Sequence, residues 1–335
     1  MHSSKPKSEA PLNCNSAHCP YCAARSRFVV ESSDRNRRTT SDTFRYYQCF
    51  SCGLVFMSPI PENLVPFYEG GYQPIPGSLA ELREIAAAEK YRMTPISRYK
   101  RGGKLLEIGP WIGIFSCNAK DAGFEVTALE MDHRCVEFLN QTLGIRAIQT
   151  NAPALTLAAL SKQNDTFDVI ALWHSLEHLR DPWRVIEEAV KCLNPGGILL
   201  IAIPNIESYQ FSVLKSAWKH LDTPRHLFFY PSGALVALCR KHGLSSLEMT
   251  AADELSVALS RDTWHSLANS VVPVRYVRGI LARGMRYVAA WGESKKNRGA
   301  GLTAVFQLAS KASAGIKSEA HGGEPFAAVE PDLPR

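Results

Sequence analysis

The sequence lacks an apolar run long enough to cross a membrane, and its first residues, MHSSKPKSEAPLN, lack the apolar core of a secretion signal. We therefore expect a cytoplasmic protein without a transmembrane segment. The composition is otherwise ordinary for a globular chain, with 45% hydrophobic and 21% charged residues. A length of 335 residues is enough for one large domain or two modest ones.

The chain also lacks an even distribution of charge, although its net charge is only +6. Residues 1–60 carry eight Lys or Arg against four Asp or Glu, and residues 261–311 carry nine against two. Residues 101–210 carry nine against thirteen, so an acidic middle lies between basic flanks. Basic flanks can meet nucleic acid, anionic lipid or an anionic substrate, or they can serve only solubility. We do not expect nucleic acid as the partner.

A third absence is the dinucleotide fingerprint G-x-G-x-x-G, which argues against a nicotinamide-linked oxidoreductase. The segment 104–130 nevertheless has the order of a nucleoside-binding half-site: a buried strand, a glycine-containing turn, a helix and a second strand. The second strand ends in Glu130, whose carboxylate can accept hydrogen bonds from ribose hydroxyls.

Two C-x-x-C pairs stand near the N-terminus, Cys19 with Cys22 and Cys49 with Cys52, separated by residues 23–48. Each two-residue gap lets both sulfurs face one ion, so the four thiolates predict a structural Zn²⁺ site with no position open for catalysis. The long spacer predicts a zinc ribbon with an enlarged hairpin. A thiol redox pair and incidental cysteines are the alternatives.

The apolar runs of the central part predict further strands of a parallel sheet. These strands are expected at 145–148, 167–173, 198–203, 246–250 and 303–308. Ligands bind beyond the carboxyl ends of the strands in such sheets. Asn151, His174 and His178 each follow one of these strands, so we expect them at the ligand-binding edge.

Several motifs together resemble those of the class I S-adenosylmethionine-dependent methyltransferases. The first turn reads E-x-G-x-x-x-G from Glu107 to Gly113, with Trp111 where the family usually has its central glycine. The segments F-D-V-I, H-S-L-E-H-L and L-N-P-G-G resemble later motifs of the family. The run C-x-x-C-G-L-V-F resembles a branch that carries an N-terminal zinc ribbon and includes sugar C-methyltransferases.

This resemblance implies an α/β fold, a Rossmann-like three-layer sandwich with a mostly parallel seven-stranded sheet, beside a small N-terminal zinc ribbon. It also implies S-adenosylmethionine as cofactor, with Glu130 on the ribose and Glu107 orienting the loop or bonding the amino group. The indole of Trp111 then either stacks beside the cofactor or crowds it. The expected cofactor-binding residues are Glu107, Gly109, Pro110, Trp111, Gly113, Glu130, Met131, Asn151, Trp173 and His174.

The stretch that begins at Trp218 is dense in groups that bind polar molecules, and it resembles the family's insertion facing the substrate. We expect Trp218, His220 and Arg225 to bind a small acceptor, such as a sugar or another hydroxylated metabolite. His226, ahead of His178, is the expected general base. The alternative is structural, with Arg225 in a local salt bridge and the histidines packed or bonded to backbone.

The resemblance and the composition together divide the chain into parts. The expected parts are a disordered segment 1–13, a zinc ribbon 14–60, a linker and covering helix 61–99, a methyltransferase domain 100–311 and a disordered tail 312–335. Inside the methyltransferase domain we expect a substrate insertion at 206–230 and a basic amphipathic helical segment at 253–292.

The arginines of 275–291 share one face of a helical wheel and its apolar side chains the other. This helix either covers its own core or meets an anionic membrane surface or another protein. A rival to the enzyme is a non-catalytic ribbon protein that binds a partner through its basic flanks.

Overall fold

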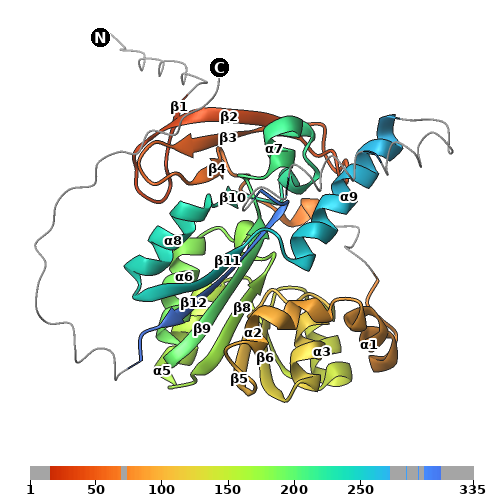
Figure 1. Ribbon diagram of the computed structural model, residues 1–335, viewed down its shortest axis with the longest axis vertical. Coiled ribbons are helices and arrows are strands. Elements are labelled where there is room, and N and C mark those ends of the chain that lie inside the picture. The colour runs from red at the N-terminus through yellow and green to blue at the C-terminus, as the bar shows by residue number, and fades with distance from the viewer. Residues whose placement is uncertain (1–15, 69–73, 272–283, 285–292, 294–297, 311–335) are drawn as a thin grey trace, which may run out of the picture.

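The computed structural model describes residues 16–68, 74–271, 284, 293 and 298–310. Its central feature is a seven-stranded sheet in the order β11-β12-β9-β8-β5-β6-β7 (Figure 1). The strands are β5 (Gly103–Ile108), β6 (Phe124–Glu130), β7 (Arg146–Gln149), β8 (Phe167–Trp173), β9 (Leu193–Pro204), β11 (Leu244–Thr250) and β12 (Gly301–Leu308). Only β12 runs antiparallel to its two neighbours, and the other pairs are parallel. The predicted Rossmann-like fold is confirmed.

Helices cover both faces of this sheet and give the three layers. One face carries α1 (Leu79–Ala87), α2 (Thr94–Ser97), α3 (Ile114–Asp121), α4 (His133–Phe138) and the start of α9 (Glu254–Val271). The other face carries α5 (Pro153–Lys162), α6 (Pro182–Lys191) and α8 (Ser232–Lys241). Because both faces are covered, a central strand such as β8 is apolar along almost its whole length.

Shorter helical segments complete the chain: η1 (Val65–Phe67), η2 (Lys90–Met93), η3 (Leu139–Leu143), η4 (Leu176–His178), α7 (Tyr209–Leu214), η5 (Lys215–Ala217) and η6 (Lys219–Leu221). The covering helix expected across 80–99 is broken into α1, η2 and α2. Pro95 stands in the first turn of α2 and has no N–H to continue a helix from the preceding turn, which accounts for the boundary between η2 and α2.

A second, antiparallel sheet lies beyond the carboxyl end of the main sheet, above it in Figure 1. It is made of β1 (Ser16–His18), β2 (Arg25–Ser33), β3 (Thr43–Cys49), β4 (Val55–Met57) and β10 (Phe228–Phe229), in that order. The last strand comes from the expected substrate insertion, not from the N-terminal segment. The ribbon and the insertion therefore form one sheet, although the sequence predicted them as two separate parts.

A buried ion-pair cluster at Arg225 joins the N-terminal strands of this second sheet to the turn before β10. The Arg225 side chain is 0% exposed and lies between Asp34, in the loop after β2, and Asp222. Its Nη2 is 2.8 Å from a carboxylate oxygen of each, its Nε is 2.9 Å from Asp222, and its Nη1 bonds Asp34 and the Phe67 carbonyl. All five guanidinium N–H groups are thus occupied. Burial opposes ionisation of Asp34, but hydrogen bonds from Arg225 and Thr39 hold its pKa well below its ordinary value.

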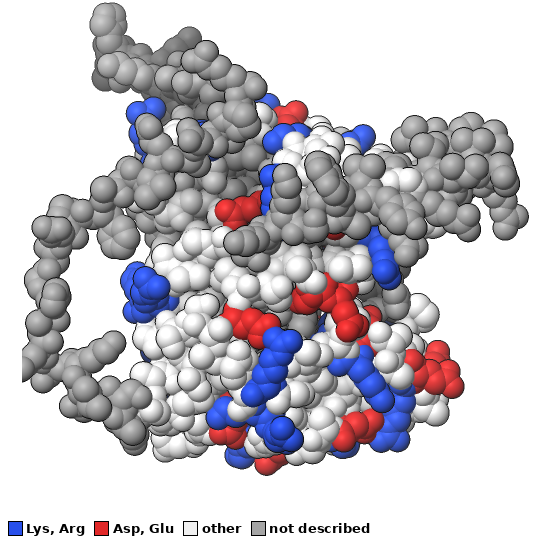
Figure 2. Space-filling view, viewed as in Figure 1, with Lys and Arg blue, Asp and Glu red and all other residues white. Residues whose placement is uncertain are grey.

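Some expected segments lie outside the described residues. These are the segment 1–13, the basic helix 275–291 and the tail 312–335. Among the residues that the structure does describe, no helix has the length and apolarity needed to span a bilayer. On the face viewed in Figure 2, acidic and basic side chains are interspersed.

Removing Asp34 should destabilise the protein strongly, because Arg225 would keep its buried charge with only one carboxylate beside it. We expect Asp34→Ala to lower the free energy of unfolding by about 3–5 kcal/mol, measured by urea denaturation. The control is Arg45→Ala, which breaks the half-exposed pair with Glu31 and should cost at most ~1 kcal/mol. Equal effects of the two variants would contradict the structural importance of the Arg225 cluster.

Candidate active site

The carboxyl ends of β5, β6 and β8 bring most of the predicted cofactor residues to one edge of the sheet. Glu107, Glu130 and Trp173 all lie at or near the ends of these strands and are buried. The amide of Gly109 donates to the Leu129 carbonyl at 2.8 Å, which ties the turn after β5 to the end of β6. The outer members of the predicted set are more open: Met131 is 51% exposed, and Asn151 is exposed after β7.

Glu130 is held in one orientation by backbone amides. Its carboxylate accepts hydrogen bonds from the N–H groups of Trp111 (2.9 Å), Met131 (2.7 Å) and Asp132 (2.9 Å). Burial raises its pKa, and these three amides oppose that shift by stabilising the charged form. Two of the bonds use Oε1, so Oε2 keeps a lone pair for a hydroxyl donor.

The turn after β5 is strained at the position where the sequence departs from the family motif. Trp111 has φ 53°, a left-handed conformation that costs an L-residue roughly 1–2 kcal/mol and costs glycine almost nothing. The flanking glycines are required by close packing as well as by positive φ. A Cβ at Gly109 would lie 2.7 Å from the Ser175 Cβ, and one at Gly113 would lie 2.4 Å from Leu139.

Arg92 also belongs to this edge. No sequence pattern predicted it as a site residue, because it was expected only as part of the covering helix. It lies in η2, where its guanidinium carbon is 5.5 Å from the centre of the Trp173 ring. Its Nε is buried and has no hydrogen-bond partner among the described residues. Nearby, burial raises the pKa of Glu107 to about 7 even though Ser116 donates to it at 2.5 Å and Arg92 lowers it.

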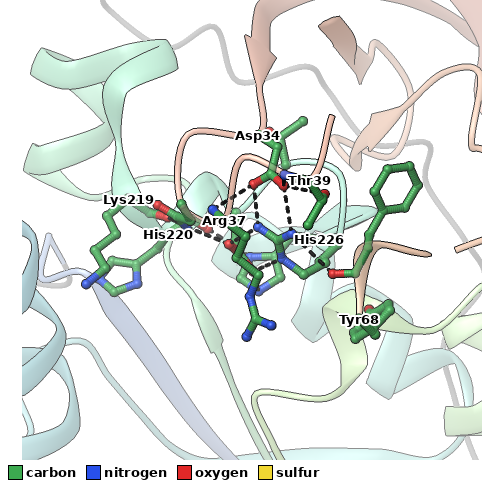
Figure 3. A network of polar contacts seen from close by, with 12 residues as sticks. Asp34, Arg37, Thr39, Tyr68, Lys219, His220 and His226 are labelled. Carbon is green, nitrogen blue, oxygen red and sulfur yellow. Dashed lines mark hydrogen bonds and ion pairs between the residues drawn. The ribbon is translucent and has the colours of Figure 1, made fainter. Parts of the chain in front are cut away.

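The two predicted bases meet beside the end of β8. The rings of His178 and His226 have centroids 4.6 Å apart, and His226 Nε2 lies 3.9 Å from Glu177 Oε1. Figure 3 shows Tyr68 on the side of the cluster away from His220, and its hydroxyl is 3.0 Å from His178 Nδ1. Glu177 Oε1 also lies 3.2 Å from the Nδ1 of His174, which connects this cluster to the cofactor edge.

Backbone carbonyls fix the tautomers of both rings. His226 Nδ1 is 2.8 Å from the His220 carbonyl, and His178 Nδ1 is 3.1 Å from the Arg225 carbonyl. A carbonyl oxygen only accepts, so each Nδ1 carries the proton and each Nε2 keeps a lone pair. The Tyr68 hydroxyl, 3.0 Å from the same nitrogen of His178, then accepts from that N–H rather than donating to it. Burial lowers the pKa of His226, and burial together with the neighbouring His226 lowers that of His178 to about 4. Both rings are therefore neutral at physiological pH.

The three residues expected to bind the acceptor are instead bonded to the protein itself. Trp218 is 2% exposed and donates from Nε1 to Gln210, and His220 Nε2 contacts the Leu259 carbonyl at 3.0 Å. Arg225 has no N–H left for a ligand, as described above. Arg225 thus forms salt bridges, as the structural alternative predicted. Its partner Asp34 is so distant in sequence that no local pattern could have predicted the pair.

The four cysteines of the two C-x-x-C pairs converge at one end of the ribbon. Their sulfurs lie within 4.8 Å of one another, with Cys19 and Cys52 at 3.7 Å and Cys22 and Cys49 at 3.4 Å. Sulfurs placed tetrahedrally around Zn²⁺ are about 3.8 Å apart, so the spacing fits the ion. Burial raises the pKa of Cys49, but amides of Cys52 and Ser51 bring it down to about 7, which favours the ligating thiolate.

Comparisons with known proteins agree with this edge geometry. A family model described as a methyltransferase domain matches residues 79–248. The chain belongs to this methyltransferase family. A ubiquinone biosynthesis O-methyltransferase of Haemophilus ducreyi is 30% identical over 159 residues, covering 44% of this chain and 67% of the relative. One from Caulobacter vibrioides is 25% identical over 190 residues, covering 52% and 75%.

Solved structures with a similar fold include a SAM-dependent methyltransferase from Archaeoglobus fulgidus. It has a TM-score of 0.46 and 13% identity, over 66% of this chain and 94% of that one. The methyl donor of the family is S-adenosylmethionine, so this methyltransferase is an S-adenosylmethionine-dependent enzyme. The non-catalytic alternative is not favoured by these matches.

Glu130 should be the side chain on which cofactor affinity depends most clearly. We expect Glu130→Ala to weaken binding of S-adenosylhomocysteine by roughly 1–3 kcal/mol in calorimetry, because ribose hydroxyls would lose a buried acceptor. Glu125→Ala, an exposed change on the same strand, is the control and should bind normally. An unchanged dissociation constant for Glu130→Ala would remove Glu130 from the cofactor site.

Proposed function

We propose that this methyltransferase methylates a hydroxyl oxygen of a small polar acceptor that binds against the Glu177, His178 and His226 side chains. The observation that supports the proposal most is the pair of neutral imidazoles with lone pairs on Nε2, because a hydroxyl nucleophile needs an acceptor for its proton. The His174–Glu177 contact places this pair next to the strand end where the cofactor is expected.

The cofactor would lie along the edge from Glu130 to Trp173. Glu130 would accept from the ribose, and the turn from Gly109 to Gly113 would pass beside the methionine portion. Arg92 is paired with Glu89 through Nη2, and its buried Nε has no hydrogen-bond partner among the described residues. That N–H is the group suited to the methionine carboxylate. When bound, S-adenosylmethionine supplies a methyl group on a positively charged sulfur, which is reactive without further activation.

The protein's own part in the reaction is to position the acceptor and to take its proton. Nε2 of His226 would take the hydroxyl proton as the acceptor oxygen receives the methyl group that the bound cofactor would supply, which would leave the cofactor as neutral S-adenosylhomocysteine. We place His226 ahead of His178 because Nε2 of His226 is also 3.9 Å from Glu177 and 4.0 Å from Asp222, carboxylates that stabilise the imidazolium as it forms.

An oxygen acceptor agrees with the printed names of the relatives, which are O-methyltransferases acting in ubiquinone biosynthesis. The resemblance of the ribbon run to sugar C-methyltransferases favours a sugar or similar hydroxylated molecule. Both point to an acceptor with hydroxyl groups, which the polar cluster of histidines and carboxylate fits. Trp218, His220 and Arg225 would then shape the wall behind this cluster without touching the acceptor.

Substituting His226 should remove the proton acceptor and leave the cofactor edge intact. We expect His226→Ala to lower turnover by about a hundredfold or more on the true acceptor, with unchanged affinity for S-adenosylhomocysteine. His133→Ala, an exposed histidine on α4, is the control and should be fully active. Wild-type turnover by His226→Ala would transfer the base role to His178 or to positioning alone.

The ribbon should hold one structural zinc ion on Cys19, Cys22, Cys49 and Cys52. Metal analysis of the purified protein should give one equivalent, and Cys52→Ser should lose it and unfold the ribbon. Because β10 belongs to the ribbon sheet, turnover should fall in this variant, whereas binding at Glu130 should persist. Cys135→Ser, a buried cysteine outside the cluster, should keep its zinc. A folded, zinc-free wild-type protein would disprove the assignment.

A further inference from the structure

The acceptor cluster contains more unpaired acceptors than hydrogen bonding explains. One nitrogen or oxygen atom each from Glu177, His178 and His226 lies within 4.8 Å of the other two. Both histidines have a proton on Nδ1 and a lone pair on Nε2, as their carbonyl contacts require. His226 Nε2 and Glu177 Oε1 are 3.9 Å apart, which is too far for a hydrogen bond. The neutral His226 ring has no proton on Nε2, and the ionised Glu177 carboxylate has none on Oε1.

Glu177 strengthens this imbalance. Its side chain is 1% exposed, and its Oε2 has no hydrogen-bond partner among the residues that the structure describes. A buried carboxylate with an unsatisfied oxygen is costly unless a positive charge lies beside it. The nearest polar neighbour of Glu177 is His174, whose Nδ1 is 3.2 Å from Oε1 and whose pKa burial lowers to about 4, so this ring is neutral too. The other neighbours are the two neutral histidines of the cluster and the carboxylate of Asp222, whose negative charge is already paired with Arg225.

We propose that Glu177, His178 and His226 bind a divalent cation, which holds and polarises the acceptor hydroxyl. Two imidazoles and a carboxylate suit first-row ions such as Mn²⁺, Fe²⁺ or Zn²⁺ and leave coordination positions open for oxygen ligands. Two ligand atoms each ~2.1 Å from one ion lie at most ~4.2 Å apart, so His226 and Glu177, at 3.9 Å, can both reach one ion. All three ligand atoms lie within 4.8 Å of one another, so small side-chain shifts bring them onto it.

The outer contacts of the two histidines have the form expected for metal ligands. A ligating histidine normally donates its other N–H to a carbonyl or carboxylate, which fixes the ring and the tautomer. His226 donates to the His220 carbonyl and His178 to the Arg225 carbonyl. Arg225 is itself immobilised by Asp34 and Asp222, so the ligand set is held from both sheets.

This inference rests on the proposed function for its chemical role. A cation bound to the acceptor oxygen lowers the pKa of that hydroxyl, so its proton leaves more easily before the oxygen bonds to the methyl carbon. An acceptor with two neighbouring hydroxyls would occupy two of the open positions. With both imidazoles bound to the ion, neither can take the proton, which would then pass to solvent. His226 would act as the proton acceptor only in the metal-free enzyme.

Cation binding can be measured without any acceptor. The full chain is dialysed against a chelator until metal analysis gives one zinc per chain, the amount expected for the ribbon. It is then titrated with Mn²⁺ while the signal of free Mn²⁺ is followed by electron paramagnetic resonance. The wild type should bind one Mn²⁺ per chain. Glu177→Gln and His226→Ala should bind at least about tenfold more weakly, because each removes one of three ligands. His133→Ala, which breaks an exposed His–Glu pair on α4, should bind as the wild type does.

Binding of S-adenosylhomocysteine checks that each variant is folded. If a variant fails that check, NMR of the wild type during the Mn²⁺ titration tests the site instead. The imidazole resonances of His178 and His226 should broaden before that of His133. Absence of Mn²⁺ binding, binding unaffected by both substitutions, or broadening only elsewhere would overturn the inference. Methyl transfer by metal-stripped enzyme at the full rate would also overturn it while leaving the proposed function in place. Mn²⁺ binding at the cluster without methyl transfer to any hydroxylated acceptor would contradict the function instead.

Discussion

The buried guanidinium of Arg225 is the contact on which the acceptor side of this enzyme depends. It joins Asp34, from a loop of the ribbon, to Asp222, in the turn before β10, and none of the three charges could be buried alone. The carbonyl of Arg225 contacts His178, and His226 is the next residue, so the turn that Arg225 immobilises also positions both histidines. The ribbon would therefore form part of the wall of the proposed acceptor site.

This arrangement separates two tasks in space. The edge from Glu130 to Trp173 is built entirely on the main sheet, with backbone amides orienting the Glu130 carboxylate. The cluster of Glu177, His178 and His226 needs both sheets, since Tyr46 of β3 donates to the His226 carbonyl and packs on Phe229. Cofactor binding should thus tolerate damage to the ribbon better than turnover does.

The sequence predicted well whatever depends on local pattern. The strand β8 has the bounds expected from its apolar run, and the order of strand, glycine turn and helix from β5 to α3 follows from Gly109 and Gly113. The convergence of four cysteines was predictable because each C-x-x-C gap is a local geometry. His178 and His226 were predicted as candidate general bases because each lies in or beside a recognisable motif. Their roles stay predictions.

What the sequence could not give depends on contacts between distant segments. Arg225 looked like a ligand because it stands among polar residues, and only the fold brings Asp34 to it. Arg92 lies in the segment expected as a covering helix, where nothing in the pattern singled it out from residues that only pack. The left-handed backbone at Trp111 has no marker in a motif that places a bulky side chain there. The pairing of β4 with β10 is likewise non-local, so the ribbon and the insertion were assigned to separate parts.

The protonation of the two histidine rings tests the account most directly, because positioning by the Arg225 turn and every proposed role of the cluster require lone pairs on Nε2. Long-range ¹⁵N–¹H correlation of histidine-labelled protein at neutral pH reports the tautomer of each ring. The account predicts the Nδ1–H tautomer for both His178 and His226, although free histidine favours a proton on Nε2. A proton on Nε2 in either ring, or a charged imidazolium, would contradict it.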